Sequence, residues 1–201
     1  MTATAQRSRI QQLWEHWILD IPLLQLVVAV LLGGLGNQLY PYAGEGARGA
    51  LCDETAHLMT TLLVLNLLPK EWRRKILVPA LPASVLIDVD HVPLAIFHTH
   101  FLTWGTDRPY THSLLTVAVA LAIAALCSIR WPKVGFVWLG IAIGLSLHFF
   151  RDLGESDASG VPLLWPFSYR SFNYGHATFD TIMVIVVAAN FLLWWIRASR
   201  S

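Results

Sequence analysis

Apolar stretches separated by short polar segments follow one another along nearly the whole chain. A helix that crosses a membrane needs about 20 mostly apolar residues, and six stretches approach that length. They cover residues 19–39, 55–69, 76–97, 112–129, 134–150 and 178–196. The second and the fifth are short, so we expect tilting or burial within the bundle to accommodate them. The pattern predicts an all-α fold: a polytopic membrane helical bundle of about six transmembrane helices, with residues 1–201 forming a single membrane-embedded domain.

The segment before the first span, residues 1–18, carries an apolar pattern of its own. Ile10, Leu13, Trp14, Trp17 and Ile18 recur at helical spacing, which indicates an in-plane helix on the cytoplasmic membrane surface. An extension of the first span, with tryptophan at the interface, explains the same pattern equally well. We prefer a retained first span to a cleaved signal peptide, because the apolar run begins late and no Ala-x-Ala cleavage pattern follows it.

The composition agrees with a membrane protein. The chain is 55% hydrophobic and 13% charged, and its mean hydropathy is +0.54, which is too apolar for a soluble domain of this length. The formal net charge of +1 offers no reason to expect a nucleic-acid partner. The sequence does not indicate an oligomeric state.

The basic residues predict the orientation of the spans. With the N-terminus inside, ten of the 14 Lys and Arg residues are cytoplasmic and four are outside, as the positive-inside rule requires. We therefore expect a multi-pass protein of the inner (cytoplasmic) membrane with both termini in the cytoplasm. Most acids then lie near the outer side, where they suit cation binding. The ten inner basic residues are Arg7, Arg9, Lys70, Arg73, Arg74, Lys75, Arg130, Lys133, Arg197 and Arg200.

Two longer loops are expected outside, at residues 98–111 and 151–177. The second is rich in aromatic residues, namely Trp165, Phe167, Tyr169, Phe172 and Tyr174. A long loop on the functional face of a compact domain is often a lid or a substrate platform. An aromatic belt at the membrane interface explains the same composition.

Histidines and acids occur near the outer end of five different spans. Ionisable residues inside a membrane are costly and usually functional. Counting about 1.5 Å per residue from the cytoplasmic end of each span places His57, Asp88, His112, His148 and Asp180 at about 18–27 Å, within a core of about 30 Å. Five spans thus contribute to one layer, which indicates a metal site.

The spacing within each helix supports the same prediction. The pairs Glu54/His57 and Asp88/His91 are three residues apart, and two further pairs are four apart, so each pair shares a helix face. Asp90 points elsewhere on an ideal helix, although Pro93 favours unwinding there. Imidazole and carboxylate ligands without thiolate suit Zn²⁺ first and Mn²⁺ or Fe²⁺ next, with one to three ions. The candidate metal ligands are His112, His148, Asp152, Asp88, Asp90, His57, His91, His176 and Asp180.

Four motifs resemble those of the YdjM-like membrane-bound metal-dependent hydrolases, over roughly residues 53–168. They are Asp88-Val-Asp90-His91, Arg108-x-x-Thr111-His112-Ser113, His148-x-x-x-Asp152 and Gly160-Val-Pro-Leu-Leu-Trp-Pro166-Phe167. That family is remotely similar to zinc-dependent phospholipase C and the zinc single-strand nucleases. The resemblance implies one zinc shared by Asp88 or Asp90, His112, and His148 with Asp152. His176-x-x-x-Asp180 resembles a terminal pair of that superfamily. Ile87, Pro109 and Glu155 depart from the family's usual residues, which bears on the substrate rather than on metal binding.

Two functions remain open at this point. The first is a hydrolase that cleaves a phosphoester, or less readily an acyl ester or amide, of a lipid or lipid-linked substrate outside the cytoplasm. Asp90 or Glu54 would be the general base, and Arg108 would hold a phosphate. The second is a metal-stabilised membrane scaffold or a metal transporter. The cytoplasmic halves of the spans are predicted to be almost wholly apolar, with Asn66 and Ser84 as the main polar groups, which favours an enzyme or a closed structural site over transport.

Overall fold

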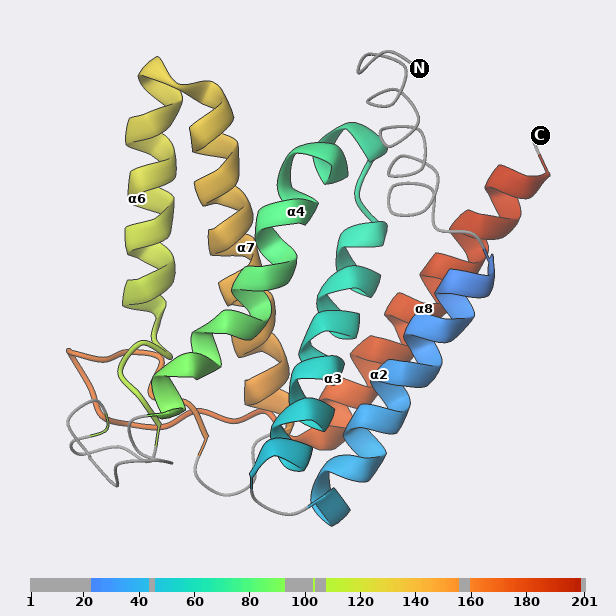
Figure 1. Ribbon diagram of the computed structural model, residues 1–201, viewed down its shortest axis with the longest axis horizontal. Coiled ribbons are helices and arrows are strands. Elements are labelled where there is room, and N and C mark those ends of the chain that lie inside the picture. The colour runs from blue at the N-terminus through green and yellow to red at the C-terminus, as the bar shows by residue number, and fades with distance from the viewer. Residues whose placement is uncertain (1–22, 44–45, 93–102, 104–107, 156–159, 200–201) are drawn as a thin grey trace, which may run out of the picture.

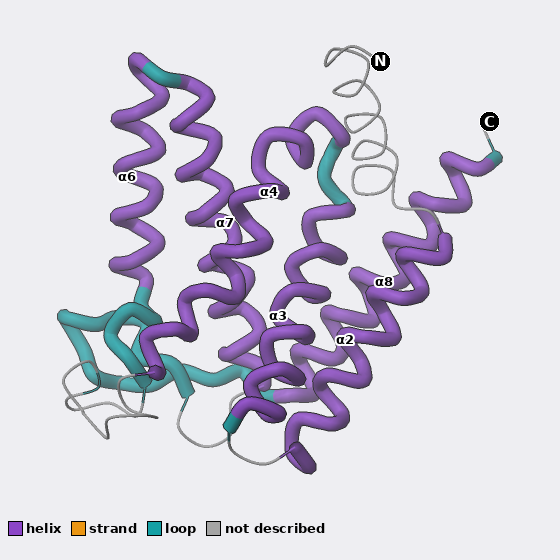
Figure 2. The backbone as a smooth tube through the Cα atoms, viewed as in Figure 1, coloured by secondary structure: helices purple, strands orange, loops and turns teal. Residues whose placement is uncertain are grey.

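A computed structural model of the protein describes residues 23–43, 46–92, 103, 108–155 and 160–199. The predicted in-plane helix within residues 1–18 and most of the loop 98–111 lie outside the described residues. In the described part, six α-helices and one 3₁₀ helix form a bundle, and only an isolated bridge joins Val161 to Phe172 (Figure 2). The predicted all-α fold is confirmed. The elements are α2 (Leu23–Ala43), α3 (Ala47–Asn66), α4 (Lys70–Leu86), η2 (Ile87–His91), α6 (Leu114–Arg130), α7 (Pro132–Glu155) and α8 (His176–Ala198).

Among the helices of the described residues, three are long and apolar enough to cross a membrane: α2, α7 and α8. Helix α6 is apolar but has 17 residues. Helices α3 and α4 carry many of the polar residues and are not among the three. The six α-helices agree in position with the six predicted spans, whereas membrane crossing by α3, α4 and α6 stays a prediction.

The helices run between two ends of different character (Figure 1). The α3–α4 and α6–α7 connections and the C-terminal end of α8 lie at one end, which we call the basic end because Lys70, Arg74, Arg130, Lys133 and Arg197 lie there. The opposite end carries η2 and the segments 108–113 and 160–175, and we call it the cluster end. Helix α3 lies in the middle of the bundle, with α2 and α8 on one side and α4, α7 and α6 on the other.

Helices α4 and α7 run in the same direction and pack closely. A Cβ atom added at Gly140 would lie 2.7 Å from the Ile76 carbonyl oxygen, and one added at Gly144 would lie 3.0 Å from the Ala80 Cα atom and nearer still to its carbonyl oxygen. Small residues spaced by four allow such backbone approach. Both pairs have the same separation in sequence, so the two helices keep one register over at least a full turn.

The basic half of the bundle is more polar inside than the sequence suggests. Arg73 is fully buried and donates to the Asn66 side chain. Asn66 Nδ2 in turn donates to Asn190 Oδ1 at 2.5 Å, and Asn190 donates to the Leu63 and Val186 carbonyls. The expectation of an almost wholly apolar cytoplasmic half is therefore wrong. The charged neighbours of Arg73 suggest a surface position, and only the packing of the helices shows that its side chain lies inside.

Candidate metal centre

The cluster begins where α4 changes into the 3₁₀ helix η2. Three residues complete one turn of a 3₁₀ helix, so side chains three apart lie directly above each other. Asp88 and His91 are three apart, and His91 Nε2 lies 3.6 Å from Asp88 Oδ1. The predicted unwinding near Asp90 is wrong: the helix tightens there into the 3₁₀ form, and Val92 before Pro93 keeps helical backbone angles. The tighter helix turns both aspartates towards the bundle.

Four side chains from η2, α7 and the segment just before α6 meet at one point. His112 Nε2 lies 3.0 Å from Asp88 Oδ1 and 3.2 Å from His148 Nε2. His148 Nε2 lies 3.4 Å from Asp88 Oδ1 and 3.2 Å from Asp152 Oδ2. His112, His148 and Asp152 are all buried. Elements far apart in the sequence thus bring two imidazoles and two carboxylates together.

The register of α4 and α7 decides how His148 is oriented. His148 follows Gly144 by one turn, and its Nδ1 lies 2.9 Å from the carbonyl oxygen of Ser84, which continues the same register. That carbonyl is one of the last four of α4, which have no partner within an α-helix. Nδ1–H therefore donates to Ser84, which leaves the lone pair of Nε2 directed at the cluster. Histidine ligands of metals usually have this kind of backbone partner.

The second histidine has a weaker support, because its buried Nδ1 makes no well-aligned hydrogen bond among the described residues. His112 Nδ1 lies 3.3 Å from Asp90 Oδ2, an oxygen that also accepts the Thr111 hydroxyl. Two imidazole nitrogens and two carboxylates that face each other in a buried place would be stabilised by a cation between them, because unpaired buried charges and lone pairs are costly. The donor set fits a Zn²⁺-like ion.

Three overlapping groups of potential ligands are present in the described residues. They are Asp88, Asp90, His91 and His112; His57, Asp88 and His148; and His112, His148 and Asp152, with the ligand atoms of each group within 4.8 Å of one another. Because the groups share Asp88, His112 and His148, more than one ion could be bound. The arrangement is compatible with the expected one to three ions.

His57 joins the cluster from α3. Its ring stacks on that of His148 with centroids 3.8 Å apart and an angle of 11°. Its Nε2 lies 3.4 Å from Asp152 Oδ1 and 3.8 Å from Asp53 Oδ1, and neither ring nitrogen has a hydrogen-bond partner among the described residues. A buried imidazole without such a partner is rare, and a metal ion would satisfy it.

The three residues predicted to act in catalysis all lie at the cluster. Glu54 is within hydrogen-bonding reach of Asp88, and its Oε2 is buried without a hydrogen-bond partner in the part of the chain that is described. Asp90 supports His112, as described above. Arg108 donates to Asp152 Oδ2 at 2.6 Å, so in this structure the guanidinium neutralises a candidate ligand.

Two of the predicted ligands are not brought to the cluster. His176 and Asp180 are exposed on the first turns of α8 and line a separate cavity with residues of α2 and α3. Asp180 has the same depth along its helix as the cluster residues, and His176 lies one turn away on the same helix face, which is why the sequence predicts them as ligands. The packing of α8 beside α2, however, directs this pair to a different space (Figure 1).

Sequence reasoning missed the support on the α3 side. Arg151 is 2% exposed, pairs with Asp53, and donates from its Nη2 to Asn37 Oδ1 at 2.9 Å. Asp53 in turn lies beside His57. From the sequence, Arg151 is only one of the four basic residues expected on the outer side of the membrane. The signal that could have found the contact is the position of Asp53 one turn before His57.

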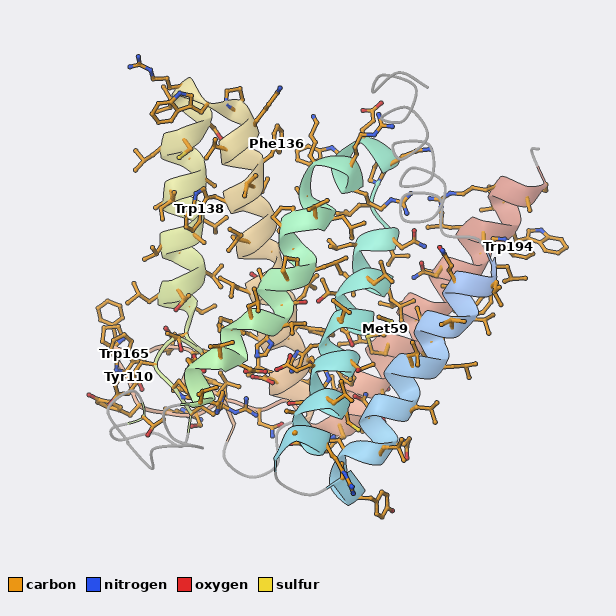
Figure 3. All side chains as sticks on the ribbon, viewed as in Figure 1. Met59, Tyr110, Phe136, Trp138, Trp165 and Trp194 are labelled. Atoms are coloured by element: carbon orange, nitrogen blue, oxygen red, sulfur yellow. The ribbon has the colours of Figure 1, made fainter. Side chains whose placement is uncertain are left out.

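The loops at the cluster end are tied together by aromatic and backbone contacts. The rings of Tyr110 and Trp165 stack with centroids 4.6 Å apart (Figure 3), and Leu114 N–H donates to the Leu163 carbonyl at 2.9 Å. The Phe167 side chain, in contrast, is 92% exposed. Part of the aromatic segment therefore braces the site, while Phe167 faces outward.

Apolar helices around a buried group of histidines and aspartates define a helical membrane protein with a candidate metal centre. Residues 53–201 match the YdjM inner membrane protein family, and the chain belongs to that family. The match includes every cluster residue described above and also α8. No curated protein and no solved structure matches the chain.

Proposed function

We propose that the protein is a membrane-bound metal-dependent hydrolase that cleaves a phosphoester of a lipid or lipid-linked substrate. The observation that carries this proposal is the convergence of His112, His148, Asp88 and Asp152 at distances of 3.0–3.4 Å. These residues would hold the metal. The bound ion would supply Lewis-acid chemistry, polarising the ester and activating water. Acyl ester or amide cleavage is the less favoured reaction.

An apolar groove beside the cluster supports a substrate from the membrane. The groove has a volume of about 640 Å³ and lies between α4 with η2, α6 and α7. Most of its wall is apolar, including Pro79, Leu86 and Ile141, while Asp90 and Thr111 lie at its cluster end. A lipid chain in this groove would bring the polar part of the same molecule to the metal centre.

The remaining residues have separate tasks in this proposal. Glu54 would accept the proton of the attacking water, since its buried Oε2 has no hydrogen-bond partner among the described residues. Asp90 would orient His112 through Nδ1. Arg108 has a side chain that is 22% exposed, so its guanidinium could also contact a substrate phosphate while it neutralises Asp152.

The basic end would face the cytoplasm and the cluster end the other side of the inner membrane. This orientation follows the positive-inside rule, and it places both termini in the cytoplasm and the metal centre in the outer half of the bilayer. A substrate would then approach from the outer leaflet.

The metal is tested first. Purified protein should contain a Zn²⁺-like ion, and His148→Ala and Asp152→Ala should each strongly reduce its content in elemental analysis. His176→Ala is the matched control, because His176 lies outside the cluster, and it should keep the ion. A wild-type protein without any transition metal would contradict the proposal.

The reaction is tested with lipids embedded in vesicles, with and without chelator. Glu54→Gln should keep the metal and lose turnover by orders of magnitude, because it removes the base without removing a ligand. Glu71→Gln, on an exposed first turn of α4, is the matched control and should be as active as wild type. If no phospholipid or lipid phosphate is hydrolysed while metal and fold persist, the metal site is structural.

Metal transport is the second candidate, and one observation favours it. Along α3, the buried side chains of His57, Thr60, Thr61 and Asn66 lead from the cluster towards the basic half. Asn66, however, donates to Asn190, and Asn190 donates to two backbone carbonyls, which indicates a closed structural contact. Zinc flux into proteoliposomes that Thr61→Val abolishes would establish transport instead.

A further inference from the structure

A second cavity, of about 940 Å³, lies between α2, α3 and α8. It is separate from the groove beside the metal cluster, since the two share no lining residue. We call it the α2–α8 cleft. It contains His176 and Asp180, the pair that the sequence suggested as ligands and that the cluster does not use.

The lining of the cleft changes from polar to apolar in one direction along both helices. On α2, Asn37 and Gln38 lie at the cluster end, and Val30 lies about two turns deeper. On α8, His176 and Asp180 lie at the cluster end, followed inward by Val184 and then Ala188. From Asp180 to Ala188 the helix rises about 12 Å. Such a gradient matches an amphiphile whose polar end is at the membrane surface and whose chain lies in the bilayer.

Glycine provides the room for a chain. Gly33 and Gly34 both line the cleft, and a Cβ atom added at Gly34 would meet no other atom within 4 Å. Gly33 is different, because its added Cβ would lie 3.1 Å from the Met59 Cβ atom, and Met59 lies on α3 facing α2 (Figure 3). Gly34 therefore keeps open a space that a larger side chain would occupy.

The polar end of the cleft indicates the chemistry of the headgroup. Asp180 is a carboxylate, and Gln38 adds an amide oxygen that accepts hydrogen bonds, whereas the Asn37 oxygen already accepts from Arg151. No lysine or arginine lines the cleft in the described part of the chain. A headgroup with net negative charge would thus meet Asp180 without a lysine or arginine to offset it, whereas a protonated amine would find the Asp180 carboxylate and the Gln38 amide oxygen as acceptors.

We propose that the α2–α8 cleft binds one membrane lipid with an amine-bearing headgroup, with the amine at Asp180 and an acyl chain between α2 and α8. This site is independent of the proposed hydrolysis, because it needs neither the metal nor the groove at Asp90. One contact connects the two sites: Asn37, at the polar end of the cleft, accepts hydrogen bonds from Arg151, which pairs with Asp53 beside the cluster.

The test is native mass spectrometry of the full chain in mild detergent, titrated with dioleoyl phosphatidylethanolamine or dioleoyl phosphatidylglycerol. Wild type should retain one phosphatidylethanolamine and bind it at least tenfold more tightly than phosphatidylglycerol. Gly34→Leu should weaken that binding at least tenfold by filling the cleft. Leu35→Phe is the matched control on α2, because Leu35 is exposed and does not line the cleft, and it should bind like wild type.

Two further variants separate the headgroup from the chain and guard against misfolding. Asp180→Asn should remove the preference for phosphatidylethanolamine, keep phosphatidylglycerol binding unchanged and retain the metal. Val184→Trp fills the cleft from α8 and should repeat the effect of Gly34→Leu. The proposal is overturned if both filled variants bind phosphatidylethanolamine as tightly as wild type does. It is also overturned if wild type binds phosphatidylglycerol or the detergent as tightly as phosphatidylethanolamine, or if Asp180→Asn loses the metal.

Discussion

The contact between α4 and α7 should control metal affinity from a distance, and Gly144→Ala tests this. The added methyl carbon would lie 3.0 Å from the Ala80 Cα atom and nearer still to its carbonyl oxygen. Ordinary contact begins at 3.4 Å, so relieving the contact with the carbonyl oxygen requires the two helices to separate by about 1 Å. The obstacle is backbone, which has no rotamer with which to move away. One turn further along the same register lies the hydrogen bond between His148 and Ser84.

The magnitude follows from that hydrogen bond, whose length is 2.9 Å. A separation of that size carries it well past about 3.2 Å, the upper end of the range for a good N–H···O bond. His148 would then lose the partner that directs Nε2 at the cluster. Loss of such a supporting contact typically lowers metal affinity by about 10- to 100-fold, or about 1.4–2.8 kcal/mol of binding free energy.

The assay is competition for Zn²⁺ against a chromogenic chelator in purified protein, together with a thermal melt. Gly34→Ala is the matched control: the same substitution in α2, where the new methyl group has open space. It should keep full metal affinity and equal or exceed wild type in stability, because alanine favours helix over glycine. Gly144→Ala protein with metal affinity within twofold of wild type would refute the reasoning.

Three further predictions concern the supports of the fold. Arg151→Met should lower the free energy of unfolding by about 2 kcal/mol, because the partly buried Asp53 and Asn37 lose the donor that the buried guanidinium provides. Arg48→Met, at an exposed site of the same end, should have little effect in a urea or thermal titration. Asn190→Leu should cost about 1 kcal/mol, as expected for a hydrogen bond between helices in a membrane, and an unchanged melting temperature would show that the Asn66 contact is dispensable. In a variant without Cys52 and Cys127, cysteine at position 48 should react with an impermeant reagent in intact cells and cysteine at position 199 only after permeabilisation; the reverse pattern would invert the proposed orientation.

The sequence by itself determined the helices and the depth of the ligands within them. Both depend on local geometry, because an α-helix rises by a nearly constant amount, about 1.5 Å, with each residue. The depths of His57, Asp88, His112 and His148 could therefore be counted before their neighbours were known, and the structure brings these four together. The apolar stretches likewise located all six α-helices, although α3 begins at Ala47 rather than near residue 55. The charged residues before position 55, which suggested that the span had not yet begun, belong to the helix. One of them, Asp53, pairs with Arg151.

Only the tertiary structure decided which side chains of equal depth meet. Asp180 lies as deep as the ligands and His176 shares its helix face, yet α8 packs beside α2 and directs both to a separate cleft. Three further features could not be predicted from the sequence. They are the burial of Arg73, the contact of Arg151 with Asp53, and the hydrogen bond from His148 to the Ser84 carbonyl. Depth along an axis is a property of one helix, whereas rotation about that axis and the choice of neighbour depend on how several helices pack. For α4 and α7 the glycines of one helix and the backbone of the other decide that packing, and with it the direction of the His148 ring.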